Sequence, residues 1–260
     1  FIRSNRAEFV VISNSNMILN TTFVDFVRTH EQSSADISVM YNRDGIKYGR
    51  PNYVFDVDRK GMVTDMLFNP ESPKSNRCSL GIVVLRRNLL IDLITDMLAH
   101  GEQYFGVHTL IKRFNVLKVR AVEYKGLVLR INDVQTYFDA SMRLLDHNTR
   151  ADLFWKGTPI YTKVKDEAPT LYQQDCDVSN ALVSDGCRIM GSVHNSILFR
   201  GVMVSKNSTV KNCVIMQDVH IADNCFLENV ILDKNAVIRP GTRLVGHSNY
   251  PVVIDKGAIV

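Results

Sequence analysis

The sequence predicts an α/β layer domain followed by a solenoid of short parallel β-strands. Two observations predict the solenoid: asparagines recur at spacings of 15, 17 and 17 residues, and aliphatic residues recur in register with them. One observation predicts the α/β layer, since the first half of the chain alternates apolar runs with amphipathic helical segments. A chain of 260 residues is long enough for each part to bury its own core.

Strand and helix signals alternate in the first half of the chain. Residues 9–12 form a continuous apolar run, typical of a strand covered on both faces in a parallel sheet. We expect Thr21 or Thr22 to cap the first helix and Gly101 to end the second. Gly61 closes a hairpin loop, because glycine tolerates a positive φ. The predicted strands are 8–13, 36–41, 53–57, 62–68, 80–85, 116–123 and 127–131, and the predicted helices are 20–31, 88–100 and 134–146.

The repeat lies between Cys176 and Gly246 and predicts about four stacked coils. Its columns are Asn180, Asn195, Asn212 and Asn229; Leu182, Ile197, Val214 and Ile231; Ile189, Val204, Ile221 and Ile238; and Val193, Val210, Leu227 and Leu244. The β-branched columns suit strands, and the Asn, Gly and Asp residues between them suit turns. We expect the column that begins at Leu182 to point inward. A mixed β-sandwich is the alternative, disfavoured because the columns persist through four copies.

Composition and charge exclude several classes of protein. The hydrophobic and charged fractions, 45% and 22%, are those of a globular protein. The net charge is +4 and the basic and acidic residues are interspersed, so no basic patch predicts nucleic-acid binding. No apolar run is long enough to span a membrane and no signal sequence is present, so we expect a cytoplasmic protein. The five cysteines lack metal-ligand spacing, and those inside the repeats are expected to be buried; they are Cys78, Cys176, Cys187, Cys213 and Cys225.

These signals divide the chain into an α/β domain at 1–147, a linker at 148–169 and a β-helix domain at 170–260. The first residue is Phe1, a strand signal follows at once, and no glycine occurs before Gly45. We therefore expect the chain to begin partway through a larger protein, with the first domain partial.

Several strings resemble the glucose-1-phosphate adenylyltransferase (ADP-glucose pyrophosphorylase) family of bacterial glycogen synthesis. They are 79–82 (SLGI), 159–162 (PIYT), 178–187 (VSNALVSDGC), 195–202 (NSILFRGV) and 230–234 (VILDK), and the resemblance covers essentially the whole chain. It implies a partial Rossmann-like nucleotidyltransferase (GT-A-like) sheet domain followed by a left-handed parallel β-helix of hexapeptide repeats. Active members make ADP-glucose and pyrophosphate from ATP and glucose 1-phosphate. Their Mg²⁺ is held by carboxylates, and charged groups hold the phosphates.

The charged groups that active members use are missing at the matching positions. Where active members carry Ser-Gly-Asp-His, this chain has Ser-Asn-Ser-Asn, so that Ser15 replaces the aspartate and Asn16 follows it. The aspartate of Asp-Val-Gly-Thr becomes Arg130 when the following helix is aligned without a gap. The lysine of Glu-Lys-Pro becomes Asn69, and the lysine of Phe-Gly-Lys-Asp becomes Val107.

Ser79 is retained at its family position. A gapped alignment would place Asp133 at the metal-binding aspartate, but it would shift the apolar face of the following helix. The ungapped alignment leaves no catalytic residue and no metal ligand in this chain, so Mg²⁺ and ATP are expected for the active members only.

This pattern resembles the GlgD-type companion subunit, which implies a regulatory subunit with a degenerate active site. The resemblance implies a catalytic homologous subunit as the partner in a heterotetramer, or a homo-oligomer, with ATP or a sugar phosphate as an unreacted ligand. Two alternatives stay open. One is an active adenylyltransferase with atypical ligands. The other is a hexapeptide-repeat acyltransferase that uses His194 or His220 as its base.

Overall fold

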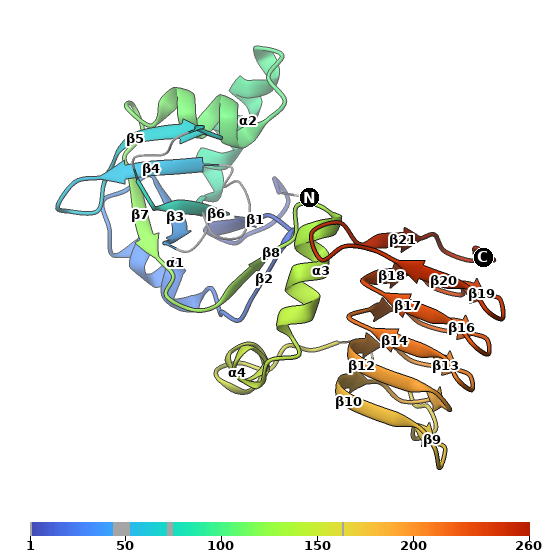
Figure 1. Cartoon of the computed structure of the whole chain (residues 1–260). Coiled ribbons are helices and arrows are strands. Elements are labelled where there is room, and N and C mark those ends of the chain that lie inside the picture. Colours follow the sequence, from blue (N-terminus) through green and yellow to red (C-terminus); the bar gives the residue numbers. More distant parts are fainter. Residues whose placement is uncertain (1, 44–52, 72–74, 163) are drawn as a thin grey trace. The chain divides into compact units, whose positions relative to one another are not determined.

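The structure is a computed structural model that describes residues 2–43, 53–71, 75–162 and 164–260. The chain folds into two compact units, Phe1–Arg130 and Ile131–Val260 (Figure 1). The predicted order of an α/β layer followed by a parallel β-solenoid is confirmed. No helix within the described ranges is long and apolar enough to cross a membrane.

The first unit is built on a mixed sheet of six strands. Its order is β5 (Val63–Phe68), β4 (Tyr53–Val57), β6 (Cys78–Arg86), β3 (Ile37–Asn42) and β7 (Val119–Glu123), and β1 (Phe9–Ser13) pairs with β6. Only the pairing of β3 with β7 is parallel. The expectation for residues 9–12 is therefore half right: alternate side chains of β1 pack into cores on both faces, but the strand is antiparallel to its neighbour.

Two helices cover opposite faces of this sheet. Alternate residues of β6 enter different cores: Val83 packs with Leu90 of α2 (Arg87–Ala99), and Ile82 packs with Phe26 of α1 (Val24–Glu31). This alternation follows from the two-residue repeat of a strand. Gly101 ends α2 with φ +68°, as predicted.

The start of α1 differs from the prediction. The helix begins at Val24, and Phe23 occupies the N-cap position without a side-chain cap. Thr21 bonds instead to the carbonyl of Thr22, so neither threonine caps the helix. Two further segments complete the unit, and neither shows a sequence periodicity because they are short or irregular. They are β2 (Met17–Leu19), which pairs with β8 (Val128–Arg130), and the π-helix η2 (Phe105–Ile111).

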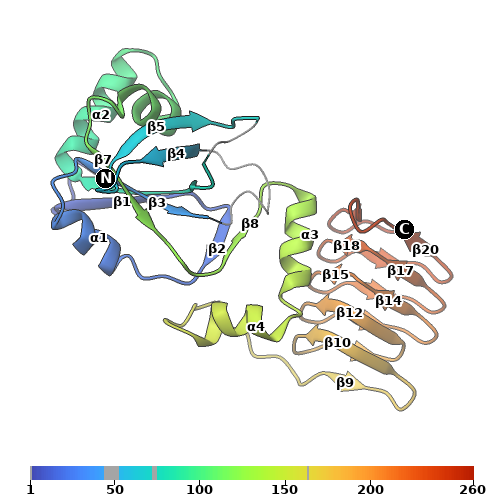
Figure 2. The same ribbon diagram turned by 60° about the vertical axis from the view of Figure 1, so that its left-hand side comes forward.

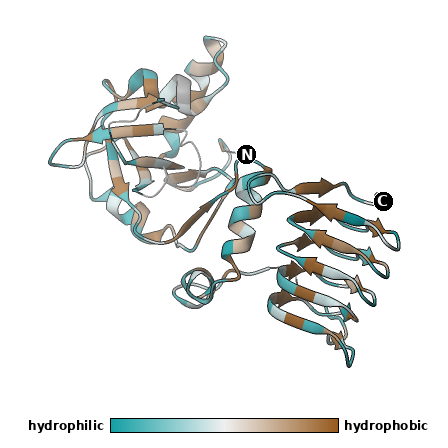
Figure 3. Ribbon diagram, in the orientation of Figure 1, coloured by the Kyte–Doolittle hydropathy of each residue, from teal (hydrophilic) through white to brown (hydrophobic). Residues whose placement is uncertain are grey.

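The second unit is a parallel β-helix of about four coils (Figure 2). Its strands are β9 (Leu171–Tyr172), β10 (Asp177–Val183), β11 (Arg188–Ile189), β12 (Ser192–Leu198), β13 (Met203–Val204), β14 (Thr209–Lys211), β15 (Val214–Ile215), β16 (His220–Ile221), β17 (Phe226–Glu228), β18 (Val230–Leu232), β19 (Val237–Ile238), β20 (Arg243–Val245) and β21 (Val252–Ile254). All strand pairs in this unit are parallel, and the predicted columns stack in the predicted register. Apolar strands alternate with hydrophilic corners along it (Figure 3).

The direction of one column was predicted wrongly. Val214 and Ile231 are buried, but they lie outside the coils, where Phe138 of helix α3 (Val134–Arg143) covers them. The residues that fill the interior at this strand are the next ones along, Ile215 and Leu232. Because side chains alternate across a strand, neighbouring apolar residues must face opposite ways.

Helix α3 also decides where the chain divides. The sequence assigned this helix to the first domain, with a boundary at 147, whereas the compact unit boundary follows Arg130. The physical reason is the apolar face of α3, which packs against the outer surface of the solenoid. The short helices α4 (His147–Arg150) and η3 (Ala151–Trp155) follow α3 in the segment predicted as a linker.

The asparagine column forms a turn in each coil. Asn180, Asn195, Asn212 and Asn229 all have positive φ, between 45° and 53°. The Asn195 amide donates to Asn212 Oδ1 at 2.7 Å and accepts from Asn180 Nδ2 at 2.7 Å. Asparagine suits these corners because it tolerates the left-handed conformation while its side chain bonds to the next coil. Cysteines 187, 213 and 225 lie in the solenoid core, as predicted.

Candidate functional site

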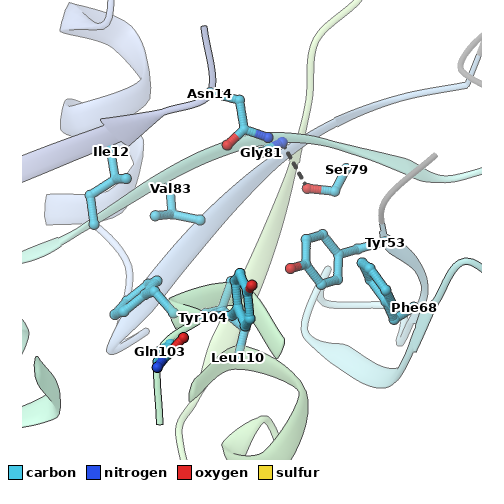
Figure 4. A pocket seen from close by; sticks show the side chains of 12 residues that line it. Ile12, Asn14, Tyr53, Phe68, Ser79, Gly81, Val83, Gln103, Tyr104 and Leu110 are labelled. Atoms are coloured by element: carbon cyan, nitrogen blue, oxygen red, sulfur yellow. Dashed lines mark hydrogen bonds between the residues drawn. The ribbon is translucent and has the colours of Figure 1, made fainter. Parts of the chain in front are cut away.

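A cavity of about 630 Å³ opens in the first unit beside strand β6 and the π-helix η2 (Figure 4). It is lined by Ile12, Asn14, Tyr53, Phe68, Ser79, Gly81, Val83, Gln103, Tyr104, Phe105, Gly106 and Leu110. Its volume falls within the range of about 300–1,000 Å³ usual for small-molecule sites. None of the described residues that line it carries a charged side chain.

Aromatic side chains form one wall of the cavity. The rings of Tyr53 and Phe68 lie with centroids 5.3 Å apart. The Tyr53 hydroxyl lies so close to Gly106 that a Cβ added there would be 2.0 Å from it. Burial raises the pKa of Tyr53, so the phenol stays protonated and presents a neutral hydrogen-bonding group.

A second wall is formed by Asn14 and Gly81. The Asn14 amide packs against Gly81, where an added Cβ would lie 2.1 Å from Asn14 Nδ2. Gly81 also has φ +62°, and its backbone N–H donates to Ser79 Oγ at 2.9 Å. Asn14 stands where the active members described above carry glycine, which has no side chain at this position.

Among the predicted site residues whose side chains the structure describes, Ser79 alone lines the cavity. Ser15 and Asn16 lie in the loop between β1 and β2, directly after the lining residue Asn14. Asn69 follows the lining residue Phe68 and has φ +43°.

The side chain of Val107 lies outside the described residues. The lining residues Tyr53, Gln103 and Tyr104 were missed by sequence reasoning. They are neutral, and Tyr53 is distant in sequence from the adjacent Gln103 and Tyr104, so no spacing or charge pattern could reveal them.

Arg130 is buried behind Ser79 with only 6% of its surface exposed. Its Nη2 donates to the Ser79 carbonyl at 2.7 Å and to Asn42 Oδ1 at 3.4 Å, while Nε has no partner in the described structure. Burial lowers the pKa of Arg130, partly opposed by Cys78. No carboxylate of the described residues forms an ion pair with it. The guanidinium therefore links β8 to β6 through the Ser79 carbonyl and to β3 through Asn42, both neutral acceptors.

Asp133 serves as the N-cap of helix α3. Its carboxylate accepts hydrogen bonds from the backbone N–H and the hydroxyl of Thr136, both at 2.7 Å. Thr136 in turn accepts from the Asp133 N–H, which completes a capping box. These bonds lower the pKa of Asp133. A local structural role therefore accounts for this carboxylate.

The two solenoid histidines have separate surroundings. His194 Nδ1 lies 2.8 Å from Ser179 Oγ, and its Nε2 lies 3.5 Å from Asp177 Oδ2. His220 is exposed on strand β16 in the other sheet of the solenoid. Across the described part of the chain, no group of three or more His, Cys, Asp or Glu side chains is placed to hold a metal ion.

Comparison with known proteins identifies the family of the chain. Residues 167–250 match the family described as GlmU-like, C-terminal hexapeptide. The chain is 33% identical over its whole length to the glycogen biosynthesis protein GlgD of Bacillus subtilis and 34% identical to that of Geobacillus stearothermophilus. It is 27% identical, over 95% of its length, to the glucose-1-phosphate adenylyltransferase of Fervidobacterium nodosum. The chain belongs to the glucose-1-phosphate adenylyltransferase family.

The chain spans 65% of the length of the two GlgD proteins and 60% of that of the Fervidobacterium enzyme. Within the glucose-1-phosphate adenylyltransferase family it is thus similar both to enzymes and to proteins named GlgD. Two features of the structure distinguish an enzyme-like function from a GlgD-like function: the lining of the cavity and the environment of Arg130.

Proposed function

We propose that this chain is part of a regulatory or helper subunit of glucose-1-phosphate adenylyltransferase in glycogen biosynthesis, with little or no catalytic activity of its own. The reaction it would serve joins ATP and glucose 1-phosphate into ADP-glucose and pyrophosphate. Such a reaction needs Mg²⁺ between carboxylates and cations on the phosphates, because negative charge spreads over the transferred group.

The observation that carries the proposal is the buried guanidinium of Arg130, at the position where active relatives carry a metal-binding aspartate. An arginine stays protonated at accessible pH, offers no lone pair to a metal and repels a divalent cation. Losing a metal ion typically removes several kcal/mol of transition-state stabilisation, which is orders of magnitude in rate.

The cavity supports the same conclusion. Its aromatic rings, amides and hydroxyls suit a neutral part of a nucleotide or sugar, but it lacks charged side chains for a triphosphate among the described lining residues. Asp133 does not restore a carboxylate to it, because that side chain already caps helix α3. An active enzyme with atypical ligands is therefore the less well supported candidate.

The helper role requires a partner. We propose a catalytic homologous subunit as that partner in a heterotetramer, with a homo-oligomer as the alternative assembly. The helper would change the turnover or substrate affinity of the catalytic subunit through a shared interface. ATP or a sugar phosphate bound without reacting would be one route for this coupling.

The test is an adenylyltransferase assay of the full-length protein alone, of a catalytic homologue alone, and of the two mixed. We expect no measurable turnover from the first and a mixture that exceeds the catalytic homologue. The double variant Ser15→Asp with Arg130→Asp should gain at most partial activity, because Asn69 and Val107 still lack charge. Turnover of the unmixed protein at the rate of the homologue would overturn the proposal.

A further inference from the structure

One corner of the solenoid is shorter than its counterparts in the other coils, and it creates a polar indentation. The connections from β9 to β10, β13 to β14, β16 to β17 and β19 to β20 each contain four residues, whereas Met190 and Gly191 alone join β11 to β12. This two-residue shortening is the source of the single 15-residue spacing in the asparagine repeat. The indentation, which we call the corner notch, has a volume of about 440 Å³.

Gly191 makes the short corner possible. A Cβ added to it would lie 2.3 Å from the Ser208 carbonyl oxygen and 2.8 Å from that of Ser205. The shortened chain therefore runs directly against the corner of the next coil, held by the Ser192 N–H that donates to the Ser208 carbonyl at 2.8 Å. Backbone contact of this kind excludes any side chain at Gly191, so the notch cannot be filled by simple substitution there.

Polar side chains surround the notch. Its lining is Gln173, Gln174, Asp175, Met190, Gly191, Ser192, Lys206 and Asn207. Within the described chain, the side chains of Gln173, Gln174, Asp175 and Lys206 make no hydrogen bond or ion pair to another residue. Asn207 donates to Asn224 at 3.3 Å, but the shortened corner of the preceding coil supplies no asparagine to bond to it in turn.

We propose that the corner notch binds a small neutral polyhydroxylated molecule of the sugar class. The one carboxylate, Asp175, and the one ammonium group, Lys206, give the lining no net charge. Asp175 would therefore repel a phosphate, and Lys206 would repel a cation. Glutamine amides both donate and accept, as sugar hydroxyls do, and the carboxylate and ammonium groups each bond to hydroxyls. The inference does not rest on the helper role, since binding is measured without a catalytic homologue.

The experiment is a titration of the ¹⁵N-labelled full chain with glucose, maltotriose and inorganic phosphate, followed by amide resonances of residues 173–176 and 205–208. We expect saturable shifts with the sugars and none with phosphate. The relative affinities of the two sugars distinguish a free monosaccharide from the end of an α-glucan chain. No saturable shift with either sugar, or binding of phosphate in their place, would overturn the proposal.

Two variants and a control sharpen the test. Replacing Met190–Gly191 by Ser-Lys-Asn-Ser, the corner of the next coil, should fill the notch and weaken sugar binding at least about tenfold. Asp175→Ala with Lys206→Ala, both exposed side chains, should weaken it to a similar extent without loss of fold. Arg239→Ala, in a corner outside the notch, should bind as the parent does. Undiminished binding by either notch variant would contradict the assignment.

Discussion

Phe138 of helix α3 packs against Val214 of strand β15, on the outer surface of the solenoid. Val214 is fully buried although it does not face the interior of the coils. The solenoid therefore has apolar residues on both sides of one strand column. The helix that covers the outer side is part of the same compact unit.

We expect this outer cluster to contribute stability comparable to that of an ordinary core. Ile231→Ala should lower the free energy of unfolding by about 2–4 kcal/mol, because a buried side chain is replaced by a cavity. Val253 continues the same column in the last coil but is 44% exposed, so Val253→Ala should cost less than about 0.5 kcal/mol. Urea unfolding measures both changes. Equal costs would mean that α3 does not cover Ile231.

A double-mutant cycle checks the contact itself. Phe138→Ala, Val214→Ala and the double variant should show a coupling energy of about 0.5–3 kcal/mol, as expected for side chains in contact. Phe138→Ala combined with Leu198→Ala, which lies inside the coils, provides the comparison and should be closer to additive. Additive costs for the first pair would contradict the packing.

Substitutions at the asparagine corners separate the effect of the left-handed backbone conformation on stability from that of the side-chain hydrogen bonds. Asn195→Gly keeps a residue suited to φ +46° and loses the two amide bonds, whereas Asn195→Ala also places an unsuitable residue in that conformation. We expect the Ala variant to be less stable than the Gly variant by about 1 kcal/mol. Thermal unfolding of the two variants gives the difference. A more stable Ala variant would show that the left-handed conformation is not required.

Asp133 distinguishes a capping role from metal binding. Asp133→Ala should lower stability by about 1 kcal/mol, because the helix loses its N-cap. Asp133→Asn should change it by only a few tenths, since asparagine caps equally well without charge. The unfolding temperature of each variant is measured with and without Mg²⁺. A Mg²⁺-dependent stabilisation lost in Asp133→Asn would reassign this carboxylate to a metal.

His30 should make stability depend on pH. It is buried, with Nδ1 2.9 Å from Ser38 Oγ and its ring edge-on to Phe9. Its pKa is lowered by burial first and by Arg86 second, with Asp36 opposing.

The folded protein therefore favours neutral His30, so its contribution is complete above the unfolded pKa of about 6.5 and is lost as pH falls through the folded value. The variant His30→Asn should show a smaller loss of stability between neutral and mildly acidic pH. An unchanged slope would exclude His30 as the cause.

The sequence by itself determined the solenoid, its register and its corners. A repeated asparagine and its aliphatic neighbours identify equivalent positions in successive coils, and equivalent positions must stack when parallel strands pair. It also determined most strands and helices of the first unit, because continuous apolar runs and helical periodicity are local signals.

The tertiary structure alone decided which way the column at Val214 faces and which unit helix α3 joins. Stacking of the coils determines which residues align, but not whether their side chains point into or out of the solenoid. Neighbouring residues such as Val214 and Ile215 are both apolar, and a one-residue step along a strand reverses the face to which a side chain points. The cavity likewise depends on neutral side chains such as Tyr53 and Gln103, brought together from distant segments. These residues show no recognisable spacing in the sequence, because they become neighbours only when the sheet packs against η2.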